Sequence, residues 1–193
     1  MTSQPERLLV TKPISQDVLQ RVYASDQGMY PAPLTLERLQ SWVVSGHDLS
    51  SSWLDADLDS DKLIGVIIVL PVLRPHWEDL LVGKIRETQL DPSVFPAAFG
   101  SHEVGLHIFH VERFGDRVRG FTELAMGEVM ARAKHRKWQV VGLSGTHLDT
   151  QVSFADGGQH LLLRLRERKH FGEWGLKPPV TLRHFWSETG RCI

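Results

Sequence analysis

The segment from His102 to Thr146 constrains the fold more than any other part of this sequence. It reads as an alternating strand over 104–112, a short polar turn, a long amphipathic helix from residue 121 and an apolar strand over 139–144. A strand, a helix and a strand in this order form a right-handed unit whose two strands lie parallel or nearly so in one sheet. The segment therefore predicts an α/β core that the other elements must complete.

The turn before the long helix is basic and contains one glycine. It carries Arg117, Arg119 and Gly120 directly before the first helical residues. A helix start offers unpaired backbone N–H groups and the positive end of the helix dipole, which together bind phosphate well. Arginine at this end opposes the dipole, which favours an anion-binding role over a role in helix stability. The alternative is that both arginines belong to a solvated helix start.

The rest of the chain supplies further strands and helices around this unit. Strands are expected over 7–12, 52–57, 62–73 and 180–186, and helices over 16–27, 36–45, 77–87 and 159–168. The β-branched run over 62–73 is typical of a strand buried on both faces. Residues 74–100 form a long connection between strands, which suggests an insertion over a site. We expect a single domain spanning 1–193.

Composition excludes several classes of protein. The 193 residues carry 22 basic and 23 acidic side chains, a net charge of -1, so no overall field attracts nucleic acid or an anionic membrane. Cys192 is the single cysteine, which fits a reducing cytoplasm. No signal peptide is visible, and the longest apolar run, 63–73, is too short to span a bilayer. The nucleophile-elbow and P-loop motifs are missing, and the ten histidines are scattered.

This order of elements resembles the GNAT acyltransferase fold. The resemblance covers most of the chain and implies a mixed, mostly antiparallel central sheet with a central βαβ unit and helices on both faces. Residues 117–122 match the family's acyl-CoA pyrophosphate signature, Q/R-x-x-G-x-G/A, except that Thr122 replaces the small last residue. The strand over 104–112, together with the insertion around Trp77, also looks like a group of fungal GNAT-like proteins.

The resemblance implies acetyl-CoA as a co-substrate. The residues expected to bind it are Phe109, Val111, Arg117, Val118, Arg119, Gly120, Phe121 and Thr122. A backbone N–H between Phe109 and Val111 would polarise the thioester carbonyl. The family often uses a tyrosine on a later helix to protonate the departing thiolate, but the only tyrosines here are Tyr23 and Tyr30.

Catalytic candidates lie on the two strands of the central unit. His110 is the first choice as general base, because histidine changes protonation near neutral pH; His107 and Glu112 are reserves, and Ser144 is a candidate general acid. Any of these histidines could instead be a hydrogen-bonded core residue. Strict alternation places His107 and His110 on opposite faces, which argues against a shared metal. The acceptor pocket is expected to involve Tyr30, His76, Trp77 and His147.

These patterns favour N-acetyltransfer from acetyl-CoA to a small-molecule amine by a cytoplasmic monomer or homodimer, with no nucleic-acid or membrane partner and no metal. Two alternatives stay open. One is a GNAT-fold enzyme of different chemistry, such as a decarboxylase, dehydratase or other lyase or isomerase, that uses pocket histidines. The other is a non-catalytic binding module.

Overall fold

The described part of the chain forms a five-stranded mixed sheet. The computed structural model describes residues 9–29, 34–56, 62–114, 118 and 120–145, so the helix expected over 159–168 and the strand expected over 180–186 lie outside the described residues. Its strands follow one another across the sheet in chain order: β1 Leu9–Lys12, β2 Ser51–Asp55, β3 Lys62–Leu73, β4 Glu103–Arg113 and β5 Gln139–Gly145. All neighbours are antiparallel except β4 and β5, which are parallel. The predicted mixed, mostly antiparallel sheet with a parallel βαβ unit is confirmed.

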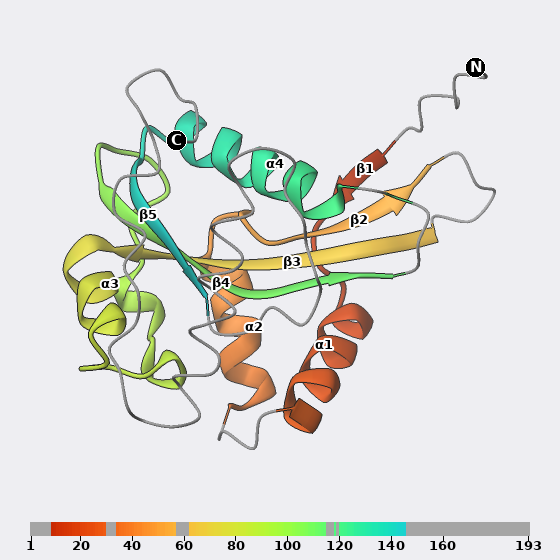
Figure 1. Cartoon of the computed structure of the whole chain (residues 1–193), viewed down its shortest axis with the longest axis horizontal. Helices are drawn as coiled ribbons and strands as arrows, with labels where there is room; N and C mark the ends of the chain where they lie inside the picture. The colour runs from red at the N-terminus through yellow and green to blue at the C-terminus, as the bar shows by residue number, and fades with distance from the viewer. Residues whose placement is uncertain (1–8, 30–33, 57–61, 115–117, 119, 146–193) are drawn as a thin grey trace.

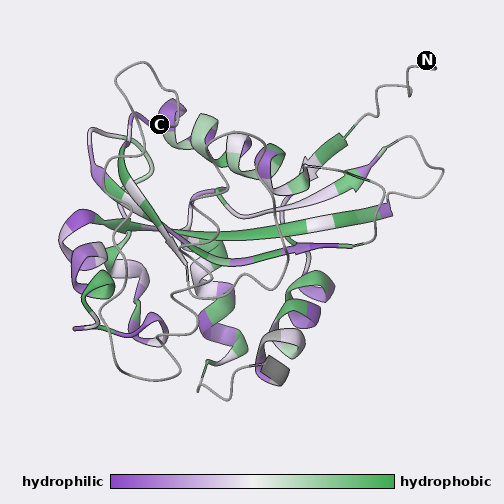
Figure 2. Cartoon of the chain, viewed as in Figure 1, coloured by the Kyte–Doolittle hydropathy of each residue, from purple (hydrophilic) through white to green (hydrophobic). Residues whose placement is uncertain are grey.

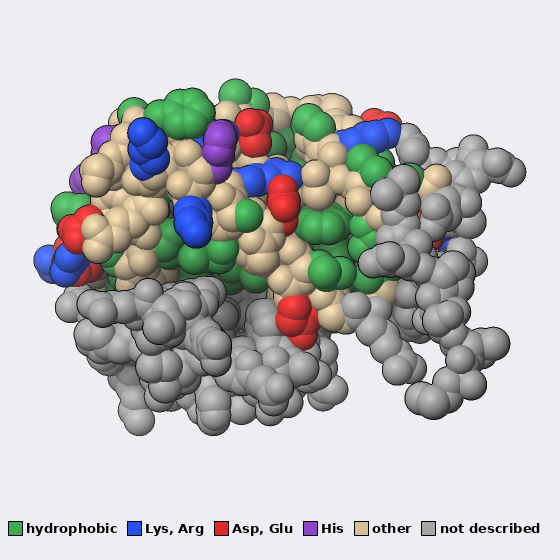
Figure 3. Space-filling view, turned by 90° about the horizontal axis from the view of Figure 1, so that it is seen from above, with side chains coloured by type: hydrophobic (Ala, Val, Ile, Leu, Met, Phe, Trp, Pro, Cys, Tyr) green, Lys and Arg blue, Asp and Glu red, His purple; other side chains and the backbone are tan. Residues whose placement is uncertain are grey.

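Helices cover both faces of this sheet. They are α1 Gln16–Met29, α2 Leu36–Ser45, α3 Arg74–Leu81 and α4 Phe121–His135, with short 3-10 helices η1 Glu87–Gln89 and η2 Pro92–Val94. Helix α4 lies on one face, and α1, α2 and α3 lie on the other (Figure 1). Each face has its own apolar core, and the strands between them are largely hydrophobic (Figure 2). On the side that carries α4, acidic and basic side chains are interspersed (Figure 3).

Helix α3 differs from its predicted range of 77–87. It begins at Arg74, because Pro75 suits the first turn of a helix, where its missing N–H costs no hydrogen bond. It ends at Leu81, and Gly83 follows with φ +76°, a conformation that ends a helical path at little cost for glycine. Glu87, expected at the helix end, instead begins η1.

Trp77 fixes α3 onto the sheet. Its side chain is 1% exposed. A Cβ atom built on Gly105 would lie 2.0 Å from Trp77 Cγ, and one built on Gly142 would lie 2.5 Å from Trp77 Cη2. The indole therefore lies against the backbones of β4 and β5, at positions where only glycine leaves room for it.

A β-bulge in β4 changes which residues share a face. Ile68 of β3 is opposite His110 and Val69 is opposite Ile108, so Phe109 has no residue opposite it. The extra residue resets the alternation of side chains. The ring of Phe109 contacts Trp42 of α2, and His107 hydrogen-bonds Ser144 on the same face. His110 is paired with Ile68, which belongs to the apolar core under α1–α3. The prediction that His107 and His110 face opposite sides is therefore wrong.

Candidate functional site

His107 stands at the centre of a buried chain of hydrogen bonds. Its Nδ1 lies 3.0 Å from Ser144 Oγ, and its Nε2 lies 2.5 Å from Glu87 Oε2. Trp77 Nε1 donates to the same Ser144 oxygen at 2.9 Å. His107 is 0% and Ser144 1% exposed, and the two residues are opposite each other in the parallel β4–β5 pair. The arrangement links η1, β4, β5 and α3 through polar groups inside the core.

His110 lies beyond the bulge on the same face. Its Nε2 is 3.3 Å from Glu112 Oε2, and the residue is 6% exposed. When the neutral imidazole donates from Nε2 to this carboxylate, Nδ1 keeps the lone pair that accepts a proton. The imidazole also lies beside Phe109, with ring centroids 6.5 Å apart. His110 and Glu112 thus form a dyad of the kind that can orient a general base.

The start of α4 has the backbone geometry that an anion site needs. Gly120 is its N-cap with φ +69° and ψ 24°, a left-handed conformation that glycine adopts freely. The ring of Phe121 packs over Gly65 of β3, where an added Cβ would lie 2.3 Å from Phe121 Cζ, and Thr122 is buried. These contacts hold the first turn against the sheet. The first-turn amides of Phe121 and Thr122 therefore occupy fixed positions, which suits the binding of an anion.

Of the residues 115–119 just before this helix, the structure describes only Val118. Val118 is buried, and its carbonyl accepts from Arg113 Nη1 at 3.3 Å. Arg117 and Arg119 lie outside the described residues. The predicted role of their guanidinium groups stays a prediction.

Glu123 places a carboxylate in the first turn of α4. Its Oε2 is buried and has no hydrogen-bond partner among the described residues, and it would lie 3.5 Å from a Cβ built on Gly120. A carboxylate at a helix start interacts well with the helix dipole. The same charge would repel a diphosphate bound to the first-turn amides.

Glu123→Gln is expected to strengthen acetyl-CoA binding. With a diphosphate on the first-turn amides, removing the negative charge of Glu123, a residue of intermediate exposure, should tighten the dissociation constant about two- to fivefold. Isothermal titration calorimetry measures the change. Glu37→Gln, in the first turn of α2, is the matched control and should leave affinity unchanged. Weaker binding in the Glu123 variant would show that the carboxylate supports the ligand.

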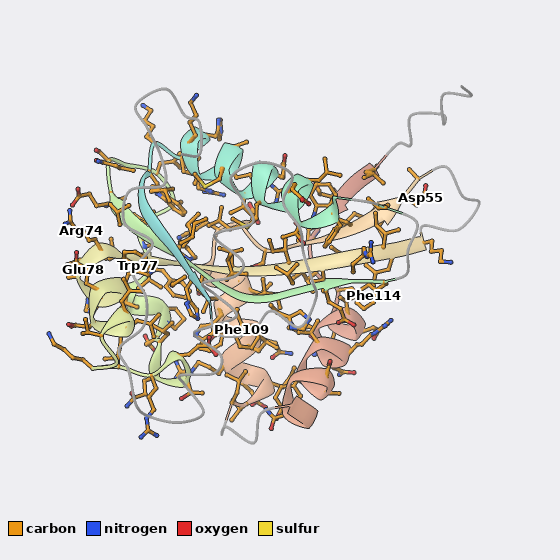
Figure 4. The ribbon with its side chains drawn as sticks, in the orientation of Figure 1. Asp55, Arg74, Trp77, Glu78, Phe109 and Phe114 are labelled. Atoms are coloured by element: carbon orange, nitrogen blue, oxygen red, sulfur yellow. The ribbon has the colours of Figure 1, made fainter. Side chains whose placement is uncertain are left out.

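The remaining predicted residues do not gather in one place. Tyr30 and His147 lie outside the described residues. His76 and Trp77 are neighbours on α3, but His76 is exposed. Trp77 is buried between α3 and the sheet (Figure 4). Phe109 and Val111 are both buried in β4, on opposite faces: Phe109 in the core under α1–α3, with its ring 5.4 Å from that of Trp42, and Val111 in the core under α4.

Sequence reasoning missed Glu87. It lies in the connection 74–100, 20 residues before His107, and the helix expected over 77–87 placed it at a helix end, whereas it begins η1. Its proximity to His107 follows from the fold alone. Within the described ranges, no group of three or more histidine, cysteine or acidic side chains could hold a metal ion. None of the helices described is long and apolar enough to cross a membrane.

Comparison with known proteins finds structural similarity at low sequence identity. No protein-family model matches the chain, and no curated protein matches it. NAA60 of Arabidopsis thaliana in complex with acetyl-CoA is 21% identical, with 84% of each chain covered and a TM-score of 0.47. A ribosomal-protein-alanine N-acetyltransferase from Brucella melitensis biovar Abortus 2308 is 10% identical, over 77% of this chain and 94% of that one, with a TM-score of 0.40. At these values the likenesses determine no activity.

The topology itself is more informative. Two helices separate β1 from β2, four strands run antiparallel, and α4 connects β4 to its parallel neighbour β5. This is the arrangement that the sequence resemblance implied. The chain has a GNAT-like fold, and the fold alone does not specify the reaction.

Proposed function

We propose that the protein transfers an acetyl group from acetyl-CoA to a small-molecule amine by direct attack in a ternary complex. The observation that carries the proposal is the β4 bulge at Phe109, which brings His110 and Glu112 to the α1–α3 face just beyond Ile108 and Gly145, the last described pair of β4 and β5. His110 acts as the base: it takes a proton from the attacking amine, and Glu112 orients its ring.

The start of α4 supports the other half of the reaction. In this proposal the diphosphate of acetyl-CoA binds the backbone amides after Gly120 and the guanidinium groups of Arg117 and Arg119. The backbone between Phe109 and Val111 polarises the thioester carbonyl. The balanced net charge of -1 favours a small acceptor over a polyanionic one.

Calorimetry with acetyl-CoA tests this proposal. Wild-type protein should bind with micromolar affinity, and Arg117→Ala combined with Arg119→Ala should abolish measurable binding, because each charge-assisted contact contributes about 1.5–3 kcal/mol. Lys84→Ala combined with Lys134→Ala removes the same charge from exposed positions away from this turn and is the control. Absence of wild-type binding at millimolar acetyl-CoA would refute the acyltransferase proposal.

A proton-transfer enzyme is the second candidate. The bulge that places His107 and His110 on one face supports it, because a lyase or isomerase needs two such groups near one substrate. Mass spectrometry of a co-purified ligand distinguishes the two. A carbonyl or hydroxy compound without coenzyme A would favour this candidate, and a coenzyme A species would favour acetyl transfer.

A further inference from the structure

In most of the hydrogen bonds around His107, the chemistry of the two groups determines which one donates. The indole N–H of Trp77 can only donate, so Ser144 Oγ accepts there. An ionised carboxylate only accepts, so His107 Nε2 carries a proton toward Glu87. Only the contact between His107 Nδ1 and Ser144 Oγ admits two directions.

These two directions have different chemical consequences. With a neutral imidazole, the Ser144 hydroxyl donates a hydrogen bond to Nδ1, so the hydroxyl proton is engaged in that bond. With an imidazolium, Nδ1 donates to Ser144, whose oxygen then accepts from both Trp77 and His107. In that state the hydroxyl proton is available to a third group. The carboxylate of Glu87 compensates the buried positive charge.

We propose that Ser144 donates the proton that the departing thiolate takes up, and that the Glu87–His107 pair resupplies it. This inference rests on the acyltransferase function proposed above. It gives the chain a route for leaving-group protonation in which Tyr23 and Tyr30 take no part. Glu87 and His107 act through Ser144 and are positioning residues.

The proton balance is complete. As the amine nitrogen bonds to the carbonyl carbon, the C–S bond breaks and the thiolate takes the Ser144 Oγ proton. Ser144 takes the Nδ1 proton of His107, which is left neutral with Nε2–H still bonded to Glu87. His110 has taken the proton of the amine. Exchange with water then removes one proton from His110 and returns one to His107.

The spacing along β4 is compatible with His110 as the base and with His107 beside the proton donor Ser144. His107 and His110 share a face and are three residues apart, so their backbone positions are separated by at most about 10 Å. A base and an acid that flank one reacting carbonyl each need a hydrogen bond of about 3 Å. Ser144 lies opposite His107 and one residue before Gly145, at the end of the described β5.

A comparison of leaving groups tests the assignment. An alkyl thiolate is a more basic leaving group than an aryl thiolate, so its departure gains more from a proton donor. Ser144→Ala should therefore lower kcat/KM with acetyl-CoA by about 10²–10⁴-fold, the usual contribution of a general acid. With S-phenyl thioacetate it should change little, and His107→Gln should show the same contrast. Ser50→Ala is the matched control, because Ser50 is also buried and hydrogen-bonds the backbone of Val69.

The possible failures are distinguishable. Equal losses with both thioesters would overturn the assignment and leave acetyl transfer intact. Wild-type protein without acetyl-CoA turnover would overturn both. Nitrogen-15 NMR of wild-type His107 needs no variant: a proton on Nδ1 directed at Ser144 supports the relay, and an unprotonated Nδ1 refutes it even where Ser144→Ala does not fold.

Discussion

Trp77→Ala is expected to lower the free energy of unfolding by about 3–5 kcal/mol, the usual cost of deleting a large buried aromatic side chain. The indole fills the space between α3 and the backbones of Gly105 and Gly142, and its N–H satisfies the buried Ser144 oxygen. Both the cavity and the lost hydrogen bond contribute. Urea denaturation followed by circular dichroism measures the loss.

A double-mutant cycle shows whether this packing is the cause. Gly105→Ala alone should destabilise strongly, because its Cβ would lie 2.0 Å from Trp77 Cγ. In the Trp77→Ala background the same change should cost far less, since the clash is gone. Val82→Ala, at an exposed residue just after α3, serves as the control and should have little effect. Additive effects of the two core changes would contradict the described contact.

His110→Gln should reduce kcat for acetyl transfer by about 10²–10⁴-fold, the range for loss of a general base. Glutamine keeps a polar group near Glu112 but cannot accept a proton at neutral pH. The KM for acetyl-CoA should stay near its wild-type value, because the proposed anion site at α4 is built from other residues. Steady-state kinetics with a panel of small amines provides the measurement.

The control for this variant is His135→Gln, an exposed histidine in the last turn of α4. It should leave kcat unchanged. A folded His110→Gln protein with full turnover would remove His110 as the base, and Glu112 would then be the next residue to substitute. A rise in KM with unchanged kcat would instead assign His110 to substrate binding.

Much of the fold was predictable from local patterns. The β-branched run over 62–73 forms the buried strand β3, and Thr35 caps α2 with its side chain accepting from the N–H of Arg38. The parallel β4–β5 pair followed from the strand–helix–strand order. Each of these depends on short-range sequence signals that the tertiary structure does not override.

The site was harder to predict, for two physical reasons. A bulge is a property of the pairing between two strands. The sequence around Phe109 does not indicate that this residue of β4 will have no partner in β3. The meeting of Glu87 with His107 depends on how an irregular connection folds over the sheet. Single-strand alternation therefore placed His110 on the wrong face, and Glu87 was not identified at all.

The sheet order has a consequence for how the protein acquires its structure. Each described strand pairs with the next one along the chain, so the sheet can grow one strand at a time as the chain is synthesised. The parallel β4–β5 contact must wait for α4 to emerge. Ser144 joins His107 only in that final step among the described strands, so the hydrogen-bond chain reports late folding.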